Sequence, residues 1–82
     1  MFYTYLLQSE KDDGFYIGST GDLKRRFQEH TEGKVTSTCN RRPLRLCYYE
    51  SYSEEWLAKE REKKLKQFGS AYTALLKRLG YK

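Results

Sequence analysis

Two spacings of hydrophobic side chains alternate along the chain, and each change of spacing marks a new element. Residues 2–8 and 15–19 are rich in aromatic and β-branched side chains, which is typical of strands. The polar segment between them ends in Asp13-Gly14, a dipeptide that favours a tight turn. The pattern therefore predicts an antiparallel hairpin over residues 2–19.

A third strand is predicted over residues 44–49, where the apolar or aromatic Leu44, Leu46 and Tyr48 alternate with Arg45, Cys47 and Tyr49. In a regular strand this alternation places Tyr49 on the same face as Cys47. Pro43 suits the first position of such a strand. The polar and basic segment 33–43 is expected to form a loop, with room for a short helical turn.

Three later stretches carry apolar residues three or four positions apart, which predicts helices. They span about residues 22–32, 53–68 and 70–79. Ser53 and Ser70 are expected to be the N-caps of the second and third helices, because a serine side chain can accept a hydrogen bond from the first helical turn. The order ββαβαα indicates a small α/β (α+β) fold, in which a three-stranded antiparallel sheet is flanked by three helices. We expect one domain over residues 1–82.

The first helix has a short apolar stripe made by Leu23 and Phe27, and Asp22 complements the positive end of its dipole. On a helical wheel His30 lies about 20° from Leu23, and Arg26 lies about 60° from it. Arg26 and His30 are also one turn apart, so they can reach one object together. We expect both at the seam between helix and sheet.

Charge and cysteine content narrow the classes of function. Sixteen basic against eleven acidic residues give a net charge of +5, which indicates a polyanionic partner or simply serves solubility. Cys39 and Cys47 have no CxxC pattern, so neither a zinc site nor a disulfide framework is indicated. The apolar start of the chain is too short for a signal peptide, and no stretch approaches a membrane span. We therefore expect a reducing, cytoplasmic setting.

Five side chains form a coherent set for phosphodiester hydrolysis. A carboxylate can hold a divalent metal ion through oxygen, as Mg²⁺ prefers. The metal and an arginine neutralise the charge that grows in the transition state, and a tyrosine hydroxyl positions or deprotonates water. The set is Tyr5 and Tyr16 on neighbouring strands, Arg26 and His30 on the first helix, and Glu62 on the second.

Each residue also has an ordinary structural interpretation. The tyrosines and His30 suit a core or its edge, and Arg26 suits a solvated surface beside Lys24 and Arg25. Glu62 suits a surface ion pair with Lys66 one turn away. Further phosphate contacts are expected from two groups, which equally suit a helix start and a solvated basic face. The first is Ser19 and Thr20, and the second is Arg41, Arg42 and Lys63.

The spacing of these residues resembles the GIY-YIG nuclease superfamily over nearly the whole chain. The second half of that motif stands here as YIG at 16–18, and YTY at 3–5 occupies the place of the first half. The family's helix arginine corresponds to Arg26 and its histidine to His30. Its metal-binding glutamate aligns with Glu62, because an apolar and a basic residue follow as expected; Glu60 gives the less favoured register.

The resemblance implies hydrolysis of DNA by water with a single Mg²⁺ or Mn²⁺ ion. Tyr5 or Tyr16 would activate the water, Arg26 would clamp the phosphate and Glu62 would bind the metal. His30 would hydrogen-bond to a tyrosine or a phosphate. The chain is most similar to small bacterial members, often compared with the nuclease subunit of the bacterial excinuclease or with Slx-type endonucleases.

Two departures from the family pattern accompany this resemblance. Tyr3 replaces the first glycine, which leaves Tyr5 in place. Cys39 stands where many relatives carry a basic residue, which weakens the case for a DNA contact there.

Three hypotheses about function follow. The first is a structure-selective endonuclease that acts on flaps, nicks or branched DNA in repair or recombination, with a protein partner adding specificity. The second is a module that binds nucleic acid without cutting it. The third is a docking domain that uses its aromatic side chains. The physiological substrate, the catalytic tyrosine and the oligomeric state do not follow from the sequence.

Overall fold

The computed structural model describes residues 1–81, and within them the predicted order ββαβαα is confirmed. A short 3₁₀ turn, η1, lies in the predicted loop before the third strand. None of the described helices is long and apolar enough to cross a membrane. The elements are β1 (Phe2–Ser9), β2 (Phe15–Thr20), α1 (Leu23–Thr31), η1 (Cys39–Arg41), β3 (Leu44–Tyr52), α2 (Glu55–Lys66) and α3 (Ser70–Arg78).

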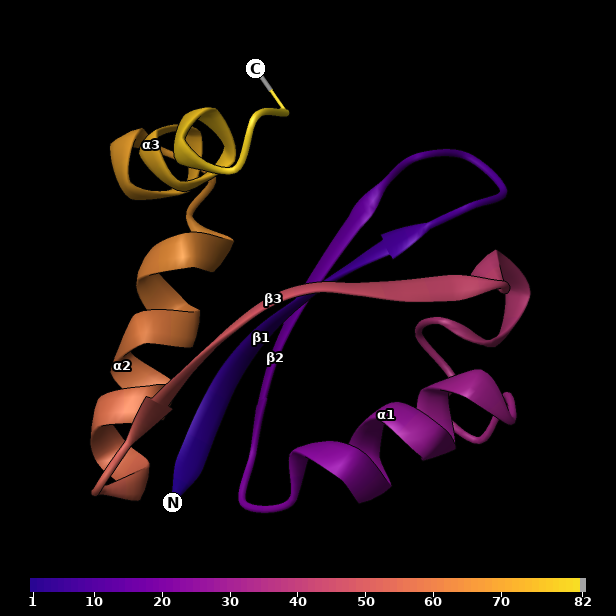
Figure 1. Ribbon diagram of the computed structural model, residues 1–82, viewed down its shortest axis with the longest axis horizontal. Helices are drawn as coiled ribbons and strands as arrows, with labels where there is room; N and C mark the ends of the chain where they lie inside the picture. Colours follow the sequence, from indigo (N-terminus) through magenta and orange to yellow (C-terminus); the bar gives the residue numbers. More distant parts are fainter. Residues whose placement is uncertain (82) are drawn as a thin grey trace.

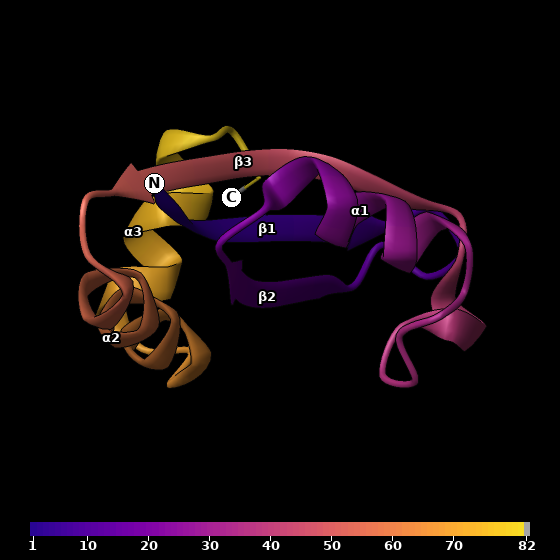
Figure 2. The ribbon, with the colours of Figure 1, turned by 90° about the horizontal axis from the view of Figure 1, so that it is seen from below.

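The three strands form one open antiparallel sheet in the order β2-β1-β3, with β1 in the centre. Helices α2 and α3 cover one face of the sheet, and α1 lies on the other (Figures 1 and 2). Because successive side chains of a strand point to opposite faces, β1 and β2 each serve both layers. The α1 side carries Tyr5 and Tyr16, and the other side carries Leu6 and Ile17.

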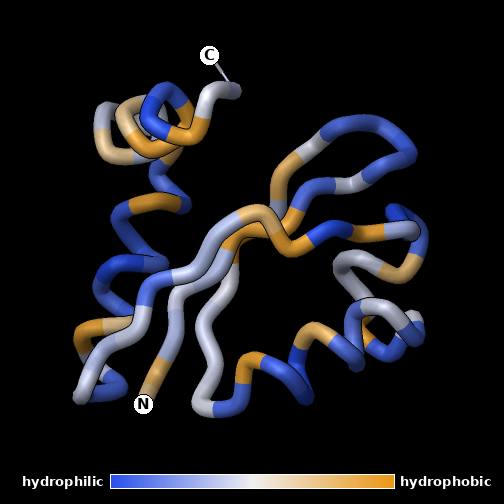
Figure 3. The backbone as a smooth tube through the Cα atoms, in the orientation of Figure 1, coloured by the Kyte–Doolittle hydropathy of each residue, from blue (hydrophilic) through white to orange (hydrophobic). Residues whose placement is uncertain are grey.

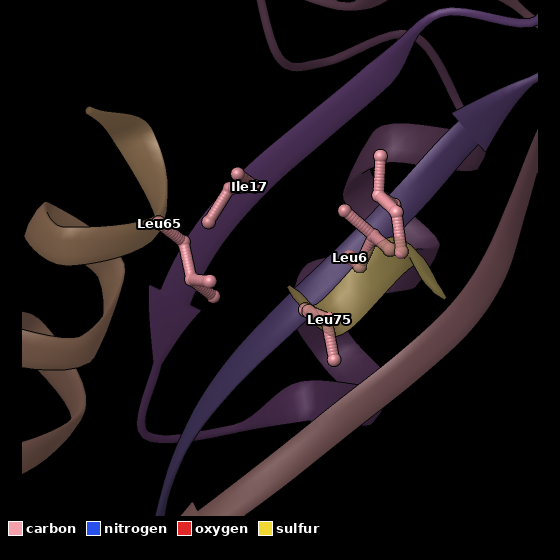
Figure 4. Packing of buried hydrophobic residues seen from close by; sticks show 5 residues of the cluster. Leu6, Ile17, Leu65 and Leu75 are labelled. Atoms are coloured by element: carbon pink, nitrogen blue, oxygen red, sulfur yellow. The ribbon is translucent and has the colours of Figure 1, made fainter. Parts of the chain in front are cut away.

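The main hydrophobic core lies between the sheet and the helices α2 and α3. It joins Leu6 and Ile17 to leucines of both helices, as Figure 4 shows. Full burial of each such side chain stabilises the fold by about 1.5–3 kcal/mol. On the opposite face the predicted stripe of α1 is only half-buried, and His30 is the buried residue of that helix. In Figure 3 hydrophobic residues lie along the middle of the strands and at intervals along the three helices.

The helix boundaries correct several details of the sequence analysis. Asp22 is the N-cap of α1, and its carboxylate accepts a hydrogen bond from the backbone N–H of Arg25 at 3.1 Å. The prediction that Ser53 caps α2 was wrong, because β3 continues to Tyr52 and the helix begins only at Glu55. The N-cap of α3 is Gly69, with Ser70 as the first helical residue.

The end of α2 also differs from the prediction. The helix stops at Lys66, and Phe68 has a positive φ of 55°, a backbone conformation outside any helix. Phe68 is 58% exposed, unlike Ala58 and Leu65, which are the buried residues of α2. Its ring packs edge-on against Tyr72 of α3, at a centroid separation of 4.9 Å.

Strand β3 contains a β-bulge, which overturns the predicted distribution of its side chains. Leu46 lies opposite Leu7 and Tyr48 lies opposite Leu6, so Cys47 is an extra residue between two regular pairs. The extra residue shifts the alternation by one position. Tyr49 therefore faces α1, opposite Tyr5, and the prediction that it shares a face with Cys47 was wrong.

Candidate active site

Tyr5 on β1 and His30 on α1 meet in the space between the sheet and α1. The Tyr5 hydroxyl lies 3.0 Å from Nε2 of His30, whose Nδ1 lies 2.7 Å from the Thr38 hydroxyl. All three residues are at most 2% exposed. Burial raises the pKa of Tyr5 to about 12, although a hydrogen bond from Arg26 opposes the rise. Burial, together with the charge of Arg26, lowers the pKa of His30, so both rings are uncharged at neutral pH.

Arg26 reaches from α1 towards both Glu29 and Tyr5. Its guanidinium donates to Oε1 of Glu29 at 3.1 Å, and this contact, followed by a hydrogen bond to Tyr5, raises the pKa of Arg26. A guanidinium only donates, so the Tyr5 oxygen accepts from it. With Arg26 donating to the Tyr5 oxygen, the Tyr5 hydroxyl is left to donate to Nε2 of His30, and that tautomer has its ring N–H on Nδ1, facing Thr38.

Tyr16 lies on the edge strand β2, on the same face of the sheet as Tyr5. Its ring packs edge-on against His30, with the ring centroids 5.2 Å apart. The ammonium of Lys66 lies 5.8 Å from the Tyr16 ring centroid. Tyr16 is half-buried, whereas Tyr5 is buried, so of the two phenols Tyr16 is the more accessible to a ligand in solvent.

Glu62 reaches the same edge of the sheet from α2. The Ser19 hydroxyl donates to Oε1 of Glu62 at 2.6 Å, and the Lys66 ammonium lies 2.8 Å from Oε2. Partial burial alone would raise the pKa of Glu62, but the Lys66 and Ser19 contacts hold it below its ordinary value. The carboxylate is thus ionised. Its charge adds to the burial that raises the pKa of Tyr5, so the acid and the phenol interact electrostatically.

A row of three side chains across the sheet holds α2 in place. Ser19, Thr4 and Glu50 are direct cross-strand partners on β2, β1 and β3. Besides the Ser19 contact, Thr4 donates to the backbone carbonyl of Ala58 at 2.7 Å, and Glu50 accepts from Nε of Arg61 at 3.1 Å. Contacts from all three strands therefore fix the position of the helix that carries the acid.

Gly18 is required by the close approach of Tyr5. The two residues are cross-strand partners, and the Tyr5 ring lies over the glycine. A Cβ at position 18 would overlap the Tyr5 hydroxyl and would lie 2.5 Å from Cζ of that ring. Any larger residue would push the buried phenol away from His30.

The five residues predicted as catalytic thus converge along β2, whereas the predicted DNA-binding residues divide into separate groups. Ser19 contacts Glu62, and Thr20 makes a local turn by accepting from the N–H of Asp22 at 3.1 Å. Lys63 is exposed on α2. At the opposite end of the sheet lie Arg41, 3.8 Å from Asp12 in the β1–β2 turn, and Arg42, which donates to the Cys39 carbonyl at 2.9 Å.

Comparison with known protein families shows to which of them this chain is related. Residues 1–75 match the GIY-YIG catalytic domain family. The chain belongs to the GIY-YIG family. The resemblance inferred from YIG at 16–18, Arg26 and Glu62 is thereby confirmed at the level of the family.

Several GIY-YIG relatives share the designation UPF0213. The chain is 39% identical over 67 residues to a UPF0213 protein of Bacillus velezensis, covering 80% of this chain and 65% of that protein. It is 36% identical over 67 residues to one of Staphylococcus haemolyticus, covering 80% of each. A UPF0213 protein of Pediococcus acidilactici is 40% identical over 57 residues, which are 66% of this chain. The match spans less than two thirds of the Bacillus velezensis and Pediococcus acidilactici proteins, at 65% and 57%.

The fold also matches a solved structure. A UPF0213 protein of Bacillus halodurans, determined by solution NMR, superposes with a TM-score of 0.59 at 29% identity. The match covers 98% of this chain and 86% of that one. The arrangement of one antiparallel sheet and three helices is therefore shared with a UPF0213 protein.

Two residues of this GIY-YIG site were missed by the sequence analysis. Lys66 was treated as a surface ion-pair partner of Glu62, but it also lies against Tyr16. Thr38 was placed in a loop, although it is fully buried against His30. The position of Lys66 one turn after Glu62 is a usable signal. Nothing in the spacing of Thr38 indicates that its loop folds back onto α1.

Proposed function

We propose that this GIY-YIG protein is a metal-dependent endonuclease that hydrolyses phosphodiester bonds in DNA. The observation that carries the proposal is the convergence at the β2 edge. Tyr16 contacts both His30 from α1 and Lys66 from α2, and Lys66 in turn holds Glu62. Phenol, imidazole, cation and carboxylate therefore lie within one connected group of contacts.

Tyr16 is the tyrosine that we assign to the attacking water. A group that positions or deprotonates water must be reachable from solvent. Tyr5 is buried, its pKa is about 12, and its hydroxyl lies 3.0 Å from Nε2 of His30, so it stays a neutral phenol. In this role Tyr5 keeps Arg26 and His30 in place.

Arg26 is assigned to the phosphate. Its side chain is 37% exposed, so it can contact both Tyr5 and a ligand at the surface. A guanidinium can form two parallel hydrogen bonds to phosphate oxygens, which Lys cannot reproduce. In the transition state this contact stabilises the charge that grows on the phosphate oxygens.

The residues present fit a divalent cation. Glu62 is an ionised oxygen donor that already attracts one cation, the Lys66 ammonium. Within residues 1–81 no group of three His, Cys, Asp or Glu side chains could enclose a metal ion, so the remaining ligands would be water and phosphate oxygens. Mg²⁺ and Mn²⁺ accept such a set, because Mg²⁺ usually keeps several waters and binds one or two carboxylates with substrate phosphate. When bound, the ion would add Lewis-acid stabilisation of the phosphate oxygens.

We further propose that the substrate is chosen by its structure, such as a flap, nick or branch, in DNA repair or recombination. The net charge of +5 supports a contact with nucleic acid. The whole of residues 1–82 would act as one catalytic domain, aided by a protein partner. A cytoplasmic location agrees with the free thiols of Cys39 and Cys47.

The test measures cleavage of branched, flapped and linear DNA with Mg²⁺, with Mn²⁺ and with a chelator. We expect metal-dependent nicking by the unaltered protein, and a loss of about 10²–10³-fold in rate for Arg26→Ala and for Glu62→Gln. The matched controls are Arg25→Ala and Glu60→Gln, which change exposed neighbours of the same type. Both controls should cut at close to the normal rate. Binding of DNA without cleavage by the unaltered protein would instead favour a non-cutting module.

A further inference from the structure

A groove of about 510 Å³ opens on the sheet face that carries Tyr5, between the start of α1 and the strands β1 and β3. One wall is formed by Tyr3 and Tyr49, whose ring centroids are 6.0 Å apart in an edge-to-face arrangement. Tyr49 is 53% exposed, so its ring is presented to solvent. The other apolar walls are Leu23, Phe27 and Leu46.

The β-bulge creates this groove. In a regular strand Leu46 and Tyr49, three positions apart, would point to opposite faces. The extra residue Cys47 allows both to face α1. Bulges often re-aim side chains next to functional sites, and this one adds an exposed tyrosine to the face of the candidate active site.

Charge and shape around the groove favour a nucleotide. Lys24 lines the groove and lies two residues before Arg26 on α1, and these two cations attract an anion. The carboxylate of Asp22, also in the lining, already accepts a hydrogen bond from the Arg25 N–H at 3.1 Å. The aromatic walls suit a flat ring, and the volume lies in the range of about 300–1,000 Å³ that is usual for small ligands. Basic residues beside exposed aromatic side chains are the combination that binds single-stranded nucleic acid.

The groove lies on the same face of the sheet as Tyr5 of the candidate active site. Tyr3 and Tyr5 are alternate residues on one face of β1, and Phe27 follows Arg26 on α1. A DNA strand with one phosphate at Arg26 would therefore have a neighbouring nucleotide beside the groove. A second copy of the chain is a poorer occupant, because two proteins of charge +5 would bring their basic α1 helices together.

We propose that this groove receives an unpaired base of the DNA strand, adjacent to the phosphate that Arg26 holds. The proposal rests on the proposed nuclease function and specifies its substrate: DNA with an unpaired nucleotide next to the cut. Stacking on tyrosine tolerates every base, because every base has a π-face. The groove would thus select flaps and gaps over intact duplex, without reading sequence.

The test is a double-mutant cycle in which the Tyr49 side chain and the DNA base are removed singly and together. Affinity is measured by fluorescence anisotropy, in chelator, for a labelled flap DNA and for versions with one abasic residue at successive unpaired positions. We expect Tyr49→Ala to weaken binding of the intact flap about tenfold, and one abasic position to do the same for the unaltered protein. Combined, the two changes should weaken binding no further. Tyr49→Phe, which keeps the ring, should bind normally.

Trp56→Ala is the matched control, since Trp56 is 66% exposed on α2 and does not line the groove. It should bind the flap like the unaltered protein. Additive losses, no loss in Tyr49→Ala, or a dimer in light scattering that Tyr49→Ala dissociates would each overturn the proposal. Because these measurements contain no metal, flap binding with the expected cycle but no cleavage in Mg²⁺ would refute the nuclease alone.

Discussion

Ser19 and Glu50 lie on the two edge strands of the sheet, and both hold α2 from the same cross-strand row. Thr4 stands between them and bonds to the backbone of the same helix. Ser19 contacts the candidate metal ligand Glu62, whereas Glu50 contacts Arg61, the preceding residue. The acid is therefore positioned by contacts that span the whole width of the sheet.

Replacing Glu50 by Gln should destabilise the protein by about 2 kcal/mol, because the half-buried Arg61 guanidinium loses its charged partner. Partial burial raises the pKa of Glu50, but bonds from Tyr52, Arg61 and Tyr48 lower it overall. A lowered carboxyl pKa adds stability above the unfolded-state pKa, and this stability is lost as pH falls through the folded-state pKa. Urea unfolding from pH 7 to pH 3 should therefore show that the free energy of unfolding falls less with acid in Glu50→Gln than in the unaltered protein.

The control for that measurement is Glu32→Gln. Glu32 pairs with Lys34 at 3.0 Å, but both side chains are well exposed, at 42% and 68%. An exposed pair contributes little, so the control should unfold like the unaltered protein. Equal losses in both variants would show that Glu50 has no special role.

His30 should make the fold sensitive to mild acid. Its pKa is lowered by burial and by the Arg26 charge, so the unfolded chain binds a proton more readily than the folded one. Stability is then complete above the unfolded pKa of about 6.5 and falls as pH drops below it. Since His30 is the sole histidine of the sequence, thermal unfolding between pH 7 and pH 5 reports on it directly. In His30→Gln, whatever its absolute stability, this fall should disappear; a slope that persists would contradict the assignment.

Gly18→Ala should disrupt the site through Tyr5. The added Cβ would meet the hydroxyl and Cζ of a ring that is 2% exposed and cannot swing into solvent. Overpacking of this kind costs about 1–3 kcal/mol, measured as a lower midpoint of urea unfolding. Gly69→Ala is the matched control, because a Cβ there meets nothing within 4 Å. Equal midpoints for the two variants would argue against a role for Gly18 in seating Tyr5.

The two tyrosines should differ in how they affect cleavage. Tyr16→Phe removes the hydroxyl that we assign to the water, and should lower the turnover rate by about 10²-fold or more. Tyr5→Phe removes a hydroxyl between His30 and Arg26, and should lower both stability and rate more modestly. Single-turnover kinetics with flap DNA, combined with urea unfolding, separates the two effects. A larger rate loss in Tyr5→Phe, with stability unchanged, would reverse the assignment.

Much of the fold was predictable because local signals agreed with it. The Asp13-Gly14 turn, the helical spacing and the position of Asp22 gave the element order correctly. Helix and strand ends were less accurate, since backbone pairing carried β3 to Tyr52 and left Ser53 outside α2. The side of the sheet on which Tyr49 lies could not be predicted, because periodicity assumes regular strand pairing and nothing in the local sequence marks the bulge.

For the candidate site, the sequence indicated which side chains could lie near one another but not the contacts between them. Spacing brings Arg26 and His30 to one side of α1, as found. The contacts of Glu62 with Ser19 and of Lys66 with Tyr16 depend on how α2 packs on the sheet, a tertiary relationship that no local pattern contains. The burial of Thr38 depends likewise on the path of its loop.

The bulge has a consequence for the length of the chain. Removing Cys47 would leave Leu46 opposite Leu7 and Tyr48 opposite Leu6, so the two pairs would become neighbours in a regular ladder. In β2 the pairing with β1 is continuous, so loss of one residue there would move the side chains on one side of the deletion to the opposite face of the sheet. Deletion of one residue should therefore be tolerated among relatives at the middle of β3 and excluded from β2.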